Sequence, residues 1–363
     1  MLNFTKRIKA LQEKLAENDL DYLFITNLFN IYYLTGFKGV SETEREVTAL
    51  IDNKELTLFS PKLYQEEARS LSQKNRFGLV VVEERHFLFT HPVKSMYRNK
   101  ILGVEADDLR ASELNELKIY SKSDIKLTQG LIESLRLEKD PEELKLVKSA
   151  VKITDDTFQL LKKEIKIGLK EKDLAKKIVQ IMDELGADGP AFDPIVASGI
   201  NSAFPHHITG NTIIKPGILL IDAGAKVKGY NADLTRTYYI GKPEKKFVKT
   251  YNLLLKTQKD VLENIKSGIK EEEPWKKAIK SLGKESKFFT HGLGHGVGLE
   301  VHESPYLRMG KKDKLETSSL VTIEPGLYYP NWGGIRIEDY ILIENKGCQV
   351  LSKTPKNIDS IIV

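Results

Sequence analysis

The alternation of apolar and polar residues predicts that the chain opens with a helix followed by a short strand. Phe4, Ile8, Leu11 and Leu15 recur at helical spacing, and residues 21–26 form an apolar run rich in β-forming residues. Polar, helix-favouring stretches such as 62–74 separate the next strand candidates, which are residues 46–51, 56–60 and 77–82. This pattern predicts a smaller α/β domain over residues 1–130.

A second pattern begins at Asp140-Pro-Glu-Glu143, where Asp140 can cap a helix, Pro141 suits its first turn and Glu143 can complete a capping box. Two apolar stripes at helical spacing follow and are expected to pack in the core. They comprise Leu144, Val147, Val151, Phe158 and Leu161, then Leu174, Ile178, Ile181 and Leu185. After Gly186, short β-type runs separated by Gly, Pro and Asn predict a curved antiparallel sheet covered by the two helices. We therefore expect an α+β domain over residues 131–363.

Composition narrows the functional classes. A chain of 363 residues with 40% hydrophobic and 29% charged residues is typical of a globular protein with two cores. The 56 basic and 51 acidic residues are interspersed, which argues against nucleic-acid binding. No apolar run reaches the roughly 18 residues that a membrane span needs. The single cysteine, Cys348, and the charged N-terminus predict a cytoplasmic protein without disulfides.

Two carboxylates lie at strand ends around a glycine-containing connection. Residues 218–222 form an apolar run that ends in Asp222, and residues 233–240 form its expected partner, beginning with Asp233. A hairpin would bring the two carboxylates within a few ångströms, where they repel unless a cation lies between them. The alternative is that both are ordinary turn aspartates.

Residues 291–302 hold three of the seven histidines and four glycines. Glycine at this density argues against a helix, so His291 and His295 are not a helical metal clamp. We expect the glycines to allow close backbone approach to a ligand. A phosphate cradle is the alternative, but the segment matches neither the Rossmann fingerprint nor the P-loop.

Two further carboxylates complete the candidate set. Glu324 ends an apolar strand before a Pro-Gly turn. Glu338 is expected on the same face of a strand as Arg336, and the simpler interpretation of these two residues is an Arg-Glu pair on the surface. Four carboxylates and one histidine form an oxygen-rich set that suits two divalent ions, and paired ions indicate hydrolysis. The predicted ligands are Asp222, Asp233, His295, Glu324 and Glu338. Mn²⁺ is the expected ion, with Co²⁺ or Zn²⁺ as alternatives.

These residues resemble those of the creatinase/aminopeptidase family of metallopeptidases, which has a pita-bread catalytic domain, and specifically its aminopeptidase P and prolidase members. The resemblance implies a dinuclear centre bridged by Asp233 and Glu338. It also implies that His206, His291, His302 and Arg336 bind substrate. Residues 32–37 look like part of the family's N-terminal domain. The chain departs from the family pattern at residues 316–320, which lack the usual Gly-Met, and at Phe204, which replaces a common leucine.

The resemblance further implies cleavage of Xaa-Pro bonds by a metal-bridging hydroxide. Glu324 would carry the proton to the leaving nitrogen, and His206 and His302 would stabilise charge on the carbonyl oxygen. We prefer aminopeptidase P activity to that of a prolidase restricted to dipeptides. A dipeptidase needs an arginine for the substrate carboxylate, and the expected position lies nearer Tyr306 than Arg308.

Two further expectations concern partners. The expected binding partner is a proline-containing peptide substrate. A homodimer is also expected, because members of the family commonly form dimers. The same fold also serves as a silent peptide-binding module, but such relatives usually lose the ligands that this chain retains.

Overall fold

The computed structural model describes residues 2–39, 44–84, 87–94 and 99–363. Its contacts divide the chain into an N-terminal unit, Met1–Arg136, and a C-terminal unit, Leu137–Val363. Each unit has its own hydrophobic core. No helix within the described ranges is long and apolar enough to cross a membrane.

The N-terminal unit is a six-stranded sheet with helices packed on it, ordered β4-β3-β2-β1-β5-β6. The strands are β1 (Tyr22–Ile25), β2 (Thr48–Asp52), β3 (Leu56–Pro61), β4 (Gly78–Val82), β5 (Ile101–Glu105) and β6 (Asp124–Thr128). The helices are α1 (Phe4–Glu17), α2 (Leu28–Thr35), α3 (Gln65–Asn75), α4 (Phe87–Lys94), α5 (Ala111–Tyr120) and α6 (Leu131–Arg136). Every strand predicted here is present, and Ile8, Leu11 and Leu15 of the opening helix are buried. The pattern missed β5 and β6, which pair in parallel with their neighbours.

The C-terminal unit begins with the predicted capped helix, α7 (Pro141–Leu161). The Asp140 carboxylate accepts hydrogen bonds from the backbone N–H groups of Glu142 and Glu143, and Glu143 accepts one from the Asp140 N–H in return. The other helices of the unit are α8 (Glu171–Glu184), α9 (Lys245–Leu262) and α10 (Glu272–Leu282). The stripes on α7 and α8 pack into the core, where Phe158 and Ile178 join Leu219 and Ile341 of the strands.

Strand pairing in the C-terminal unit is antiparallel, as expected, but is divided among several short sheets. One has the order β12-β9-β8, another β14-β13-β15-β18-β19, a third β11-β10-β7, and β16 pairs with β17. The bounds are β7 (Gly189–Pro190), β8 (Ile195–Ser198), β9 (Gly217–Asp222), β10 (Ala225–Val227), β11 (Tyr230–Asn231), β12 (Thr235–Ile240), β13 (Gly294–Gly296), β14 (Glu303–Leu307), β15 (Leu320–Ile323), β16 (Gly326–Tyr329), β17 (Gly333–Arg336), β18 (Asp339–Glu344) and β19 (Gly347–Val350).

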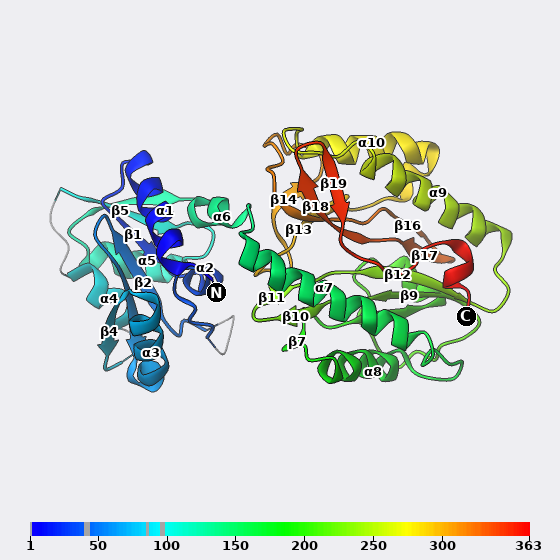
Figure 1. Ribbon diagram of the computed structural model, residues 1–363, viewed down its shortest axis with the longest axis horizontal. Coiled ribbons are helices and arrows are strands. Elements are labelled where there is room, and N and C mark those ends of the chain that lie inside the picture. Colours follow the sequence, from blue (N-terminus) through cyan, green and yellow to red (C-terminus); the bar gives the residue numbers. More distant parts are fainter. Residues whose placement is uncertain (1, 40–43, 85–86, 95–98) are drawn as a thin grey trace. The chain divides into compact units, whose positions relative to one another are not determined.

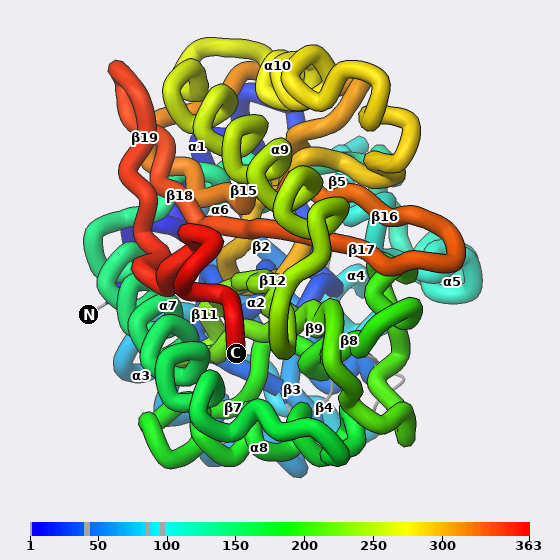
Figure 2. The backbone as a smooth tube through the Cα atoms, turned by 90° about the vertical axis from the view of Figure 1, so that its right-hand side faces the viewer, coloured from blue at the N-terminus to red at the C-terminus, as the bar shows by residue number. Residues whose placement is uncertain are grey.

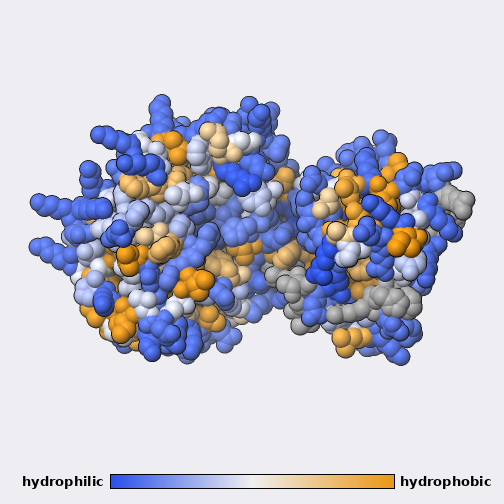
Figure 3. Space-filling view, turned by 180° about the vertical axis from the view of Figure 1, so that it is seen from behind, coloured by the Kyte–Doolittle hydropathy of each residue, from blue (hydrophilic) through white to orange (hydrophobic). Residues whose placement is uncertain are grey.

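The helices cover the strands from outside. Figures 1 and 2 show α9 and α10 on one side of the strands and α7 and α8 on another. Seen from behind, the larger body in Figure 3 is mostly hydrophilic, with hydrophobic residues in separate groups. This two-unit architecture with helices around antiparallel strands is the predicted α+β pita-bread arrangement, and it encloses the strand ends that carry the candidate ligands.

Candidate active site

Asp222 and Asp233 lie side by side because their strands pair directly. In the ladder of β9 and β12, Asp222 is opposite Thr235, two residues beyond Asp233. The connection is longer than the expected simple hairpin, since it forms the β10–β11 ladder. The backbones cross so closely that a Cβ on Gly224 would lie 1.7 Å from the Ala232 carbonyl oxygen. Both carboxylates are buried, which excludes ordinary turn aspartates.

His295 projects from the middle of β13. A Cβ on Gly294 would lie 1.9 Å from the Thr322 carbonyl oxygen, and one on Gly296 would lie 2.2 Å from that of Ser304. These glycines therefore allow β13 to pass between β14 and β15. The expectation that all the glycines approach a ligand was wrong for these two, because the approaching atoms belong to neighbouring strands.

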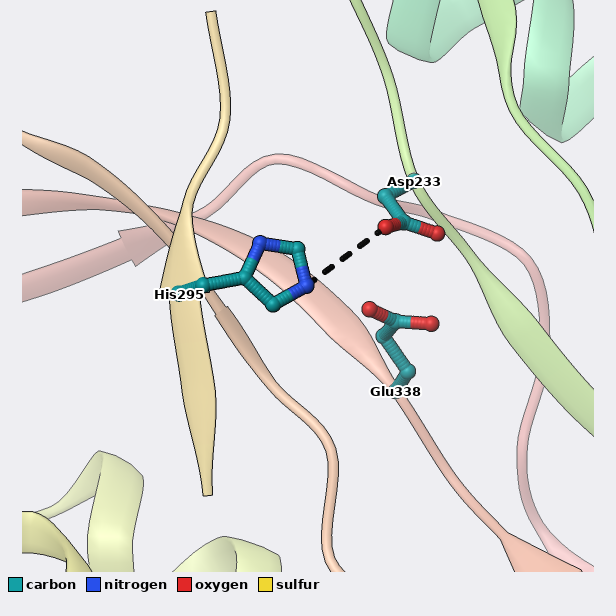
Figure 4. A group of neighbouring side chains, drawn as sticks. All are labelled: Asp233, His295 and Glu338. Carbon is teal, nitrogen blue, oxygen red and sulfur yellow. Dashed lines mark ion pairs between the residues drawn. The ribbon is translucent and has the colours of Figure 1, made fainter. Parts of the chain in front are cut away.

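The remaining carboxylates come from strand ends on the same side. Glu324 follows β15 and Glu338 lies between β17 and β18. The His295 Nε2 atom is 3.3 Å from a Glu324 oxygen and 3.8 Å from an Asp233 oxygen. One ligand atom each of Asp233, His295 and Glu338 lies within 4.8 Å of the others, and Figure 4 shows the three side chains converging.

The electrostatics of the five residues fit bound cations. Burial raises the pKa of Asp222, and it raises those of Asp233 and Glu338 well above the ordinary value, with the neighbouring carboxylates adding to the effect. Burial also opposes ionisation of Glu324, but the hydrogen bond and charge of His295 lower its pKa to about 2. Among the described residues, the Oδ1 atoms of Asp222 and Asp233 are buried and have no hydrogen-bond partner. Divalent cations would satisfy these oxygens and offset the repulsion.

Arg336 is buried against Asp222, so the interpretation as a surface Arg-Glu pair was wrong. Its Nη2 donates to the Asp222 carboxylate at 2.7 Å, and its Nε donates to the Thr235 hydroxyl at 2.9 Å. Its Nη1 donates to the Tyr328 hydroxyl and to the Pro205 carbonyl. Arg336 lines the cavity as well. Because its Nε, Nη1 and Nη2 atoms all donate to protein groups, the main role of Arg336 is to orient the Asp222 carboxylate.

A cavity of about 460 Å³ opens beside the carboxylates and is lined by His206, His291 and His302. The His291 ring lies 3.0 Å from the Tyr328 hydroxyl, and burial lowers its pKa. The His302 ring is 4.2 Å from that of His295 between centroids. Partial burial and the neighbouring His295 lower the pKa of His302 to about 4, so that it is neutral at pH 7.

The cavity wall also contains residues that the sequence analysis did not select. Phe192, Ile195 and Val301 form apolar wall. Tyr306 and Arg308, which the sequence analysis considered for the substrate carboxylate, both line the cavity as well. Tyr328, which links His291 to Arg336, was also missed. Tyr328 lies on β16, two residues after the Pro-Gly turn that follows Glu324, and nothing in this local sequence indicates its contact with His291.

Comparison with known proteins agrees with this geometry. Residues 145–345 match metallopeptidase family M24, and residues 7–137 match the creatinase/prolidase N-terminal domain. The chain is 34% identical over 358 residues to a protein of Pyrococcus furiosus named Xaa-Pro dipeptidase, covering 97% of this chain and 99% of that one. The structure superposes on an Xaa-Pro dipeptidase from Bacillus anthracis with a TM-score of 0.91 at 31% identity, covering 99% and 100% of the two chains. An X-Pro aminopeptidase from Thermotoga maritima gives 0.87 at 28% identity, with coverage of 98% and 99%.

Proposed function

Since this chain belongs to metallopeptidase family M24, we propose that it is an Xaa-Pro dipeptidase that uses two divalent ions. The family resemblance expected from the sequence is thereby confirmed. The relatives named Xaa-Pro dipeptidase support the prolidase alternative better than the aminopeptidase P activity that we had preferred. The observation that carries the proposal is the meeting of three buried carboxylates, the partly buried Glu324 and His295 at the end of a cavity that Arg308 also lines.

The proposed metal ligands are the five converging residues, which would together hold the two ions. Mn²⁺ is the proposed metal, and Co²⁺ and Zn²⁺ suit the same oxygen-rich donors. Ions held there would supply a water of near-neutral pKa and a Lewis acid for the substrate carbonyl. Metal analysis of the purified protein checks the stoichiometry and the identity of the metal.

The chain's own side chains would then handle protons and charge. Glu324, which lines the cavity, is proposed to accept a proton from the attacking water and pass it to the proline nitrogen as the peptide bond breaks. His206 and His302 face the cavity and can donate N–H hydrogen bonds to the carbonyl oxygen as charge develops on it. His291 is proposed to help to line the substrate site.

Arg308 is the proposed partner of the dipeptide's C-terminal carboxylate. Its guanidinium lies 5.4 Å from the centroid of the Tyr306 ring, and it has no ion-pair partner within the part of the chain that the structure describes. An arginine beside the cavity can form a charge-assisted, two-pronged contact with a carboxylate. A longer peptide would present a neutral amide at that point.

Aminopeptidase P activity is the second candidate, favoured by the likeness to the Thermotoga maritima X-Pro aminopeptidase. Metal-stripped protein should be assayed on Gly-Pro and on the tripeptide Gly-Pro-Pro, before and after addition of Mn²⁺, Co²⁺ or Zn²⁺. Metal-restored cleavage of Gly-Pro but not of Gly-Pro-Pro supports the dipeptidase. Cleavage of the tripeptide supports aminopeptidase P, and cleavage of neither refutes the enzyme proposal.

We also propose that the protein forms a homodimer. The side chains of Phe204 and Ile208, on either side of His206, are 61% and 89% exposed, and such apolar groups commonly mark contact surfaces. Light scattering during size-exclusion chromatography measures the mass in solution, and a monomer at micromolar concentration contradicts the proposal. The cytoplasmic location stays a prediction.

A further inference from the structure

The ring of His302 lines the cavity and is placed there mainly by its backbone. Within the described residues the ring makes no hydrogen bond, although its carbonyl oxygen accepts one from the Tyr306 hydroxyl at 3.3 Å. The ring also contacts His295, at 4.2 Å between centroids. The place of His302 therefore depends on what holds residues 297–303, the segment that we call the His302 loop.

A buried ion pair lies directly behind this loop. The Lys139 Nζ atom is 2.7 Å from the Glu303 carboxylate, and the two side chains are 1% and 5% exposed. Glu303 is the residue after His302 and begins β14. Lys139 lies 164 positions away along the chain, just before the cap of α7.

The Glu303 carboxylate also packs against the inside of the loop. A Cβ on Gly298 would lie 2.3 Å from a Glu303 oxygen, so the carboxylate and this backbone are in direct contact. The Glu300 N–H points to the other Glu303 oxygen at 3.4 Å. The carboxylate thereby fills the space under the turn that presents His302.

Two more anchors hold the first half of the same loop. Asn231 donates through its backbone and side chain to the Gly298 carbonyl at 2.8 and 3.1 Å, and to that of Leu299 at 2.9 Å. The Tyr340 hydroxyl donates to the Val297 carbonyl at 2.7 Å. These contacts end at Leu299, and the half of the loop next to His302 is held by the Glu303 carboxylate with Lys139 and by the Tyr306 hydroxyl at the His302 carbonyl.

We propose that Lys139, through its buried ion pair with Glu303, positions His302 for the reaction, an inference that rests on the proposed dipeptidase function. Removing the ammonium group takes away the positive charge that lies 2.7 Å from the buried Glu303 carboxylate, which is strongly unfavourable. The loop then has to move so that water reaches Glu303, and His302 moves with it. A displacement of about 1 Å in an active site can lower turnover by about 100-fold.

The test compares Lys139→Met with Lys145→Met in protein reconstituted with metal. Lys145 lies in α7, six residues after Lys139, and forms an exposed ion pair with Glu142 at 2.8 Å, so it is the matched control. We expect Lys139→Met to lower kcat by about 10- to 100-fold with little change in KM and with the metal content retained. Lys145→Met should match the unchanged protein. Glu303→Gln serves as the second variant if Lys139→Met does not fold, and Lys139→Arg should recover part of the loss.

Two readouts separate positioning from a general structural effect. If Lys139 acts through His302, the double variant Lys139→Met/His302→Ala should be no slower than His302→Ala alone. In metal-free protein labelled with ¹⁵N-histidine, the His302 signal should shift in Lys139→Met and stay in place in Lys145→Met. Additive losses, an unmoved His302 signal or a loss of activity that follows loss of metal each overturn the inference. If the unchanged protein cleaves no Xaa-Pro dipeptide, the proposed function fails, and the histidine signal still decides the positioning role.

Discussion

Replacing Arg308 with alanine tests whether the site reads a free carboxylate. A hydrogen-bonded contact to a charged group is worth about 1.5–3 kcal/mol. Because Arg308 is exposed at the cavity edge, we take the lower end, about 1.5 kcal/mol, which corresponds to roughly a tenfold loss in kcat/KM. The loss should appear mainly in KM, since the carboxylate lies away from the bond that breaks.

The assay compares Gly-Pro with its C-terminal amide, which lacks the carboxylate. Arg308→Ala should slow cleavage of the acid about tenfold and leave the already slow cleavage of the amide unchanged. Lys311→Ala is the matched control, because the Lys311 ammonium lies 5.4 Å from the same Tyr306 ring but does not line the cavity. Equal losses on acid and amide, or a loss in Lys311→Ala equal to that in Arg308→Ala, would refute the reasoning.

Three further predictions address the metal centre and the two folded units. Glu338→Gln should remove the rise in melting temperature on adding Mn²⁺, because a buried proposed ligand is lost. Calorimetry with and without metal checks this, and an unchanged rise contradicts it. Gly294→Ala should destabilise the C-terminal unit by at least about 3 kcal/mol, because the added Cβ would overlap the Thr322 carbonyl. In the control Gly210→Ala the nearest contact of the Cβ is 3.8 Å away, so the loss of stability should be about 1 kcal/mol or less. Urea unfolding measures both losses, and similar values contradict the prediction. Burial raises the pKa of Glu105 to about 7 from an ordinary 4.5, so the folded state binds the proton of this carboxyl group more tightly than the unfolded state does. The free energy of unfolding of the N-terminal unit should therefore fall by up to about 3 kcal/mol as pH rises from about 4.5 to 7. Glu105→Gln should abolish this pH dependence, and an unfolding profile with the same pH dependence as that of the unchanged protein would contradict the prediction.

Local pattern was sufficient for the elements and for most candidate ligands. The capping box at Asp140 and the stripes on α7 and α8 were readable because helix ends and helical faces are encoded within a few residues. Asp222 and Glu324 were recognisable because each ends an apolar strand with a carboxylate, an expensive choice unless something binds it. The short strands β5 and β6 were missed, although β4, which also pairs in parallel with its neighbour, was predicted.

What tertiary structure alone decided is which distant side chains meet. The strand pattern placed Arg336 and Glu338 on one face, yet only the packed sheets show that Arg336 bonds to Asp222, 114 positions away. Tyr328 and Lys139 gave no local sign of their links to His291 and Glu303, because an ion pair or hydrogen bond between remote segments leaves no period in the sequence. The density of glycines around His295 was visible in the sequence, but the reason for it was not. Only the pairing of β13 with β14 and β15 shows that backbone atoms of these strands occupy the space that a side chain would need. The sequence by itself thus determined the chemistry available to the site, and the register of strands far apart in the chain determined its geometry.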